Sequence, residues 1–176
     1  MPILADPESV NFALLGLRLL LAVVMLAHGI NHIFGGGKID GTAGWFASMG
    51  MRPGWLHAWA ASGTEIGAGV MLAAGLLTPL AAGGVVGVMA VAFVVNHRKN
   101  GFFIFRPGEG YEYVLTLTVM ALVAATLGPG EWSIDDAADL GDLAGWSGLL
   151  IASGSGFGGA ALLLAGFWRP TREADD

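Results

Sequence analysis

Five long apolar stretches alternate with short polar connections along the chain. They lie at about residues 11–34, 55–77, 80–96, 111–127 and 146–168. Each is close to the ~20 residues that an α-helix needs to cross the hydrocarbon core of a bilayer. The pattern therefore predicts an all-α transmembrane helical bundle, formed as a single transmembrane domain over residues 1–176.

The connections between these stretches are of three kinds. Residues 35–53 include an apolar stretch, Thr42 to Met49, that is too short to span; we expect a short interfacial or re-entrant helix with Trp45 at headgroup level. The pair Thr78-Pro79 predicts a tight turn, because proline suits the first position of a new helix. Residues 131–142 are acidic and predict a solvent-exposed connection.

Composition supports a membrane location and excludes several other classes. Hydrophobic residues make up 55% of the chain and charged residues only 12%, against about 25% charged residues in soluble domains. The net charge of −6 comes without a basic patch, which argues against nucleic acid as a partner. The absence of cysteine excludes a disulfide, a thiolate metal site or a thiol relay in this chain. The acidic leader also predicts no cleavable signal peptide.

The distribution of positive charge predicts the orientation. If the five stretches cross alternately, one side of the membrane receives seven basic residues and the other receives none. The positive-inside rule then places the basic side in the cytoplasm of a bacterial plasma membrane. We expect the N-terminus outside and the C-terminus inside. The seven residues are Lys38, Arg52, Arg98, Lys99, Arg106, Arg169 and Arg172.

Two ionisable residues, Arg18 and Glu65, interrupt the first and second apolar stretches. Such groups are costly in a bilayer and rarely face lipid. Counted from the outer ends of their stretches, the two residues lie at depths close enough for an extended arginine side chain to reach the glutamate. We therefore expect an intramembrane ion pair between them. The pair is either a structural lock between two helices or a protonatable carboxylate beside a ligand or a proton path.

Glycines at close spacing predict tight helix packing. Gly63 and Gly67, and likewise Gly83 and Gly87, have GxxxG spacing. The GxGxxG at residues 154–159 lies inside an apolar stretch and follows no predicted strand. Helix packing explains it better than a nucleotide-binding loop.

A second group of polar residues gathers near the predicted cytoplasmic ends of the stretches. His28 and His32 are four residues apart and share a helix face. These histidines are either ordinary interfacial residues, the lining of a quinone headgroup pocket, or part of a metal or haem site. No HExxH motif and no third ligand is evident, so we assign no metal ligand. The candidate ligand-binding residues are His28, Asn31, His32, His57, Tyr111 and Glu112.

Several of these segments together resemble the DoxX family of small bacterial membrane proteins. The likeness covers about residues 11–136 and rests on LLGLRLLLAVVMLAHGINHIFGG, GWFASMGMRP, SGTEIGAGVMLAAGLLTPLAA and the NGFF, GYEY and LGPGEWSID elements. It implies four core spans, with the stretch at 146–168 as a fifth C-terminal span outside the usual core. The family name derives from a membrane subunit linked with thiosulfate:quinone oxidoreductase. The resemblance therefore implies a quinone-facing subunit with Arg18, His28, Glu65 and Glu112 at motif positions.

We therefore expect a membrane subunit of a redox-linked, quinone-associated envelope complex. It would bind quinone or lipid in the bundle and dock partner proteins in or on the bilayer. If it belongs to an oxidoreductase, it would be a subunit that is not catalytic alone, with any sulfur chemistry in a partner. One alternative is a non-enzymatic scaffold subunit that uses the glycine-rich fifth span. Another is a small transporter with Glu65 as its proton site.

Overall fold

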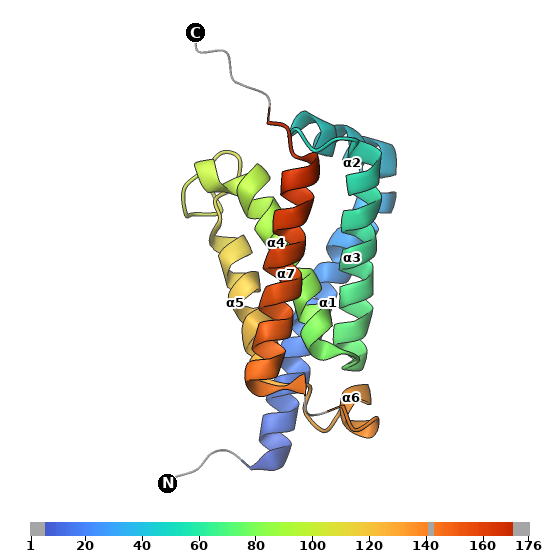
Figure 1. The fold of residues 1–176 in the computed structure, drawn as a ribbon, viewed down its shortest axis with the longest axis vertical. Coiled ribbons are helices and arrows are strands. Elements are labelled where there is room, and N and C mark those ends of the chain that lie inside the picture. The colour runs from blue at the N-terminus through green and yellow to red at the C-terminus, as the bar shows by residue number, and fades with distance from the viewer. Residues whose placement is uncertain (1–5, 141–142, 171–176) are drawn as a thin grey trace.

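The computed structural model describes residues 6–140 and 143–170, and this part of the chain is helical with no strand (Figure 1). The expected all-α fold is confirmed. The helices are α1 (Pro7–Phe34), α2 (Lys38–Ser48), α3 (Gly54–Ala74), α4 (Thr78–Val95), the short 3-10 helix η1 (His97–Lys99), α5 (Glu112–Leu127), α6 (Ile134–Ala137) and α7 (Gly145–Phe167).

The five long helices run up and down the bundle (Figure 1). Each is antiparallel to the preceding long helix, in the order α1, α3, α4, α5 and α7. Their bounds follow the predicted apolar stretches closely. Helix α1 begins four residues earlier than expected, since Pro7 starts it and Asp6 caps it by accepting a 3.0 Å hydrogen bond from the Ser9 N–H. Helix α4 likewise begins at Thr78, with Pro79 in its first turn.

Three helices, α1, α4 and α7, are long and apolar enough to cross a membrane. The 16 residues of α5 give a length of roughly 24 Å, somewhat short of a ~30 Å hydrocarbon core. Helix α3 has 21 residues, but polar side chains such as Ser62 and Glu65 lower its hydropathy. That all five helices span the bilayer, with α2 at the interface, remains a prediction.

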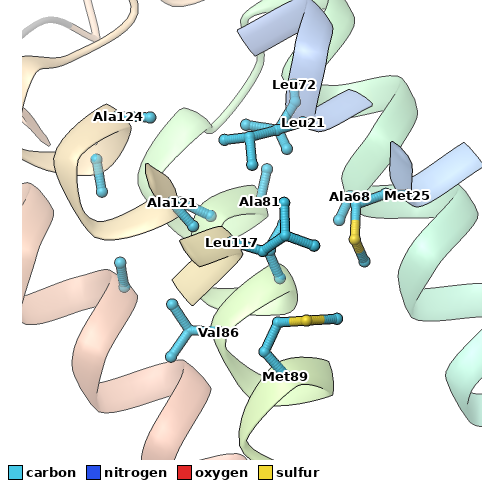
Figure 2. Packing of buried hydrophobic residues seen from close by; sticks show 14 of the residues in the cluster. Leu21, Met25, Ala68, Leu72, Ala81, Val86, Met89, Leu117, Ala121 and Ala124 are labelled. Atoms are coloured by element: carbon cyan, nitrogen blue, oxygen red, sulfur yellow. The ribbon is translucent and has the colours of Figure 1, made fainter. Parts of the chain in front are cut away.

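The bundle core is built from small and medium apolar side chains (Figure 2). Leu21 of α1 lies beside Leu72 of α3 and Met25 beside Ala68, and alanines and valines fill the space among α4, α5 and α7. Glycine allows α7 to approach its neighbours closely. A Cβ at Gly148 would stand 2.1 Å from the Ala125 carbonyl oxygen, and one at Gly156 would stand 2.6 Å from the Val86 side chain.

The loop between α5 and α7 packs against the turn between α3 and α4. Asp135, which is 1% exposed, accepts hydrogen bonds from the backbone N–H groups of Leu77 (2.6 Å) and Thr78 (2.8 Å). Its own N–H donates to the Gly75 carbonyl at 2.8 Å. The carboxylate therefore caps the first turn of α4 from a distant segment.

The two ends of the bundle differ in charge. The end that carries the α4–α5 loop and α2 holds Lys38, Arg52, Arg98, Lys99, Arg106 and Arg169. The end that carries the start of α1 and α6 holds acidic residues, among them Asp6, Glu8, Glu131, Asp135 and Asp136 (Figure 1). The seventh basic residue of the predicted set, Arg172, lies outside the described residues. This asymmetry agrees with the pattern on which the predicted orientation depends.

Candidate functional site

A cavity of about 520 Å³ lies among α1, α3, α4, α5 and α7. Most of its lining is apolar, and its polar groups gather toward the basic end of the bundle. The lining includes His28 and His32 of α1, Phe46 of α2, His57, Thr64 and Glu65 of α3, Leu80, Gly83, Gly84 and Gly87 of α4, His97, Tyr113 of α5, and Ser155, Gly156 and Gly159 of α7.

The floor of the cavity is formed by α4, and its walls are formed by α3 and α7. A Cβ at Gly83 would stand 2.1 Å from the Ser155 hydroxyl of α7, whereas one at Gly84 would stand 3.2 Å from Ala68 of α3. Successive glycines of α4 therefore face opposite walls. From Leu80 to Asn96 this floor is roughly 24 Å long.

The cavity is closed at the basic end and open to the side farther down. At the basic end the α2–α3 connection pairs with the end of α7, where the Arg169 N–H donates to the Gly50 carbonyl at 2.8 Å. Below this bridge, Thr64 of α3 and Gly159 of α7 both line the cavity and are exposed on the outer surface of the bundle. The cavity therefore opens to the side of the bundle between α3 and α7.

Three side chains from two helices meet at the polar end of the cavity. The Glu65 Oε2 lies 3.1 Å from the His32 Nδ1, and Glu65 is only 3% exposed. One potential ligand atom each from His28, His32 and Glu65 lie within 4.8 Å of one another. The Tyr113 hydroxyl lies 3.0 Å from the His28 Nε2, so α5 also contributes to this group.

Two further histidines line the same cavity. His57, 3% exposed, packs its ring against Phe167 and Phe46 at centroid distances of 5.3 and 6.4 Å, and its Nε2 has no hydrogen-bond partner. The Nδ1 of His97 lies 2.8 Å from the Glu109 carbonyl oxygen, which holds the α4–α5 loop over the end of the bundle. The cavity thus has a polar end rich in imidazole and an apolar remainder.

The structure brings together only some of the candidate residues chosen from the sequence. His28, His32 and His57 line the cavity, whereas Asn31, Tyr111 and Glu112 do not. Asn31 lies exposed near the end of α1.

Tyr111 and Glu112 instead hold the α4–α5 loop. The Tyr111 ring packs edge-on against Phe93 and Phe102, at 5.5 and 5.6 Å, and the Glu112 Oε2 accepts a 3.2 Å hydrogen bond from the Ile104 N–H. Of the GYEY segment, only Tyr113 lines the cavity. Side chains two apart point to different sides of a helix, and Tyr113 is the one that faces the cavity.

The expected pairing of Arg18 with Glu65 is not what the structure shows. The buried Arg18 guanidinium donates to the Trp132 carbonyl at 2.6 Å and to the Leu72 carbonyl at 3.4 Å. Glu65 lies beside Gly29, where a Cβ would stand 3.0 Å from the Glu65 Cβ. The eleven residues from Arg18 to Gly29 correspond to roughly 16 Å along α1, too far for the two side chains to meet.

Glu65 was therefore recognised as a functional candidate from the sequence but matched to the wrong partner. The sequence does not show which way a long side chain extends, and the Arg18 guanidinium extends toward the Trp132 and Leu72 carbonyl groups, away from Glu65. The sequence feature that indicates the true partner is Gly29, which has no side chain. It lets α3 approach α1 one turn before His32.

Comparison with known proteins gives one family match. No curated protein and no solved structure matches the chain. The family model DoxX matches residues 13–98, which hold nearly all of α1, then α2, α3, α4 and the start of η1. This segment supplies His28, His32, His57, Glu65 and the glycine floor of the cavity, while Tyr113 and α7 lie beyond it. This match over residues 13–98, just under half of the chain, is consistent with a DoxX family protein.

Proposed function

We propose that this protein is a quinone-binding membrane subunit of a redox-linked envelope complex. The observation that carries the proposal is the shape and chemistry of the cavity. Ligand sites are typically apolar pockets of about 300–1,000 Å³ with a few convergent polar groups, and the cavity of about 520 Å³ matches that description.

A quinone fits this arrangement better than a compact polar molecule does. Its ring needs hydrogen bonds from more than one side, and Tyr113, His28 and His32 offer them from two helices. Its isoprenoid tail needs a long apolar groove, and the floor of α4 offers roughly 24 Å between α3 and α7. The lateral opening allows exchange with quinone in the bilayer.

The close pair of His32 and the buried Glu65 gives the site a route for protons. Reduction of a quinone to a quinol adds a pair of electrons and a pair of protons. Imidazole and carboxylate side chains side by side can pass protons to ring oxygens. The chain has no cysteine, so no thiol of its own can supply the electrons. In this proposal, a docked partner protein with its own redox group supplies them.

The test uses a groove-blocking variant. Gly159 lines the cavity on α7, and a Cβ there would meet nothing within 4 Å, so Gly159→Trp fills the groove without a clash at the backbone. Gly154→Trp is the matched control, because Gly154 lies on the same helix, also meets nothing within 4 Å and does not line the cavity. Protein purified from native membranes in mild detergent is extracted with organic solvent, and the quinone per chain is measured by chromatography.

We expect near-stoichiometric quinone in the wild type and in Gly154→Trp, and at least a tenfold loss in Gly159→Trp. Glu112→Gln should also keep its quinone, since Glu112 is outside the cavity. The proposal fails if the wild type carries no quinone above the level of an unrelated membrane protein. Co-purification of a stoichiometric partner without quinone would instead favour the scaffold function, and phospholipid retained in its place would make the cavity a lipid site.

A further inference from the structure

The structure assigns a second role to the polar end of the cavity: we propose that His28, His32 and Glu65 bind a divalent transition-metal ion. The sequence offered only the histidine pair on one face of α1. The fold adds a carboxylate from α3, which is the third ligand that the sequence did not reveal.

The distance between His32 and Glu65 matches two ligands of one metal. With metal–ligand bonds of about 2.1 Å, neighbouring ligand atoms stand about 3.0 Å apart at a right angle and about 3.4 Å apart at a tetrahedral angle. The observed distance from His32 Nδ1 to Glu65 Oε2 is 3.1 Å. The nitrogen and oxygen thus already have the spacing of a chelating pair.

These two atoms also lack good hydrogen bonds. Both His32 Nδ1 and Glu65 Oε2 are buried, and neither makes a hydrogen bond of acceptable geometry, although they face each other. Buried polar atoms are nearly always satisfied in native proteins. A metal ion between them would satisfy both at once.

His28 completes the set from the exposed side. It is one helical turn before His32, and its nitrogen is within 4.8 Å of the other two ligand atoms. His28 is the most exposed of the three residues. The Tyr113 hydroxyl, 3.0 Å from the His28 Nε2, orients that ring.

The chemistry of the ligands indicates the class of metal. A pair of imidazoles with a single carboxylate suits Zn²⁺ or Fe²⁺ and leaves coordination positions open. Hard cations such as Ca²⁺ and Mg²⁺ prefer oxygen ligands and would bind poorly. His28, His32 and Glu65 line the cavity, so an exogenous oxygen, including that of a quinone, could reach such an ion from there. An ion bound to His32 Nδ1 and Glu65 Oε2 would take the place of the proton route proposed for these two atoms. The metal inference does not require the quinone proposal, since the three ligands belong to the chain alone.

The test measures metal binding by the purified full chain with a histidine-free affinity tag. Chelator-treated protein in detergent is titrated with Zn²⁺ and, separately, with Co²⁺, whose visible absorption reports nitrogen and oxygen coordination. We expect one ion per chain, at least tenfold weaker binding in His32→Ala and Glu65→Gln, and unchanged binding in Glu112→Gln. The last variant makes the same carboxylate-to-amide change outside the site.

A rise in the unfolding temperature of the wild type with Zn²⁺, absent in Glu65→Gln, would support the site even if His32→Ala folds poorly. The inference is overturned if neither ion binds at 100-fold excess over protein, or if Glu65→Gln and Glu112→Gln bind alike. If the protein carries quinone but binds no metal, only this inference fails. If it binds metal but carries no quinone, only the proposed function fails.

Discussion

The Arg18 guanidinium donates a 2.6 Å hydrogen bond to the carbonyl oxygen of Trp132, 114 residues further along the chain. Through it, the first helix holds the loop between α5 and α7 against the end of α3. The second donor of Arg18 reaches the Leu72 carbonyl in the last turn of α3. A cation suits that position, because a helix C-terminus carries partial negative charge. Arg18 thus stabilises the bundle at the end opposite the cavity's polar group.

Arg18→Leu should destabilise the protein, because the Trp132 carbonyl loses its hydrogen bond from a charged donor and the Leu72 carbonyl keeps only the Gly75 N–H. A loss of about 1.5–3 kcal/mol is expected for a hydrogen bond to a charged group. The measurement is the unfolding temperature in mild detergent, with Lys99→Leu, which removes an exposed cation, as the control. Arg18→Leu and Glu65→Gln should also be additive within about 0.5 kcal/mol. A larger coupling would mean that the two groups interact after all.

Asp135→Ala should loosen the start of α4. The N–H groups of Leu77 and Thr78 would lose their acceptor in a buried turn, at a cost of about 1–3 kcal/mol. Hydrogen exchange at these two amides should accelerate before that of the rest of α4. Asp136→Ala changes the neighbouring carboxylate, which is exposed, and should leave both amides protected. Equal exchange in the two variants would contradict the capping role of Asp135.

Gly156→Ala should weaken the packing of α7 on α4, since its new Cβ would stand 2.6 Å from the Val86 side chain. Overpacking of this kind typically costs about 1–3 kcal/mol. Gly158→Ala, two residues later, meets nothing within 4 Å and should be neutral or slightly stabilising. Thermal unfolding of both variants in the same detergent tests the difference. The opposite order would show that α7 packs by another face.

The predicted topology places the acidic end outside and the basic end in the cytoplasm. The chain has no cysteine, so each cysteine variant carries a single thiol. Ser9→Cys and Ala137→Cys, both exposed at the acidic end, should react with an impermeant maleimide in intact cells. Phe105→Cys, exposed at the basic end, should react only after lysis. The reverse pattern would invert the orientation. Reaction of all three variants in intact cells would contradict the prediction that α5 crosses the membrane between Phe105 and Ala137.

Local patterns in the sequence were sufficient for the helices themselves. The apolar stretches end at proline, glycine and charged residues, and the helices end within a few positions of them. The short helix before Arg52 was also predicted, since the stretch from Thr42 to Met49 is apolar but too short to span, although α2 begins earlier, at Lys38. These features depend on neighbours along the chain, which is why the sequence predicts them.

Only the tertiary structure decided which polar groups meet. The partner of Glu65 is His32 and not Arg18, because Gly29 sets the register of α1 against α3. Tyr113 faces the cavity and Glu112 does not, because the rotation of α5 is fixed by its packing on α4 and α7. The sequence by itself determined that buried ionisable residues and small residues occur in apolar helices. Their pairing depended on how closely each pair of backbones can approach, and that is a property of the assembled bundle.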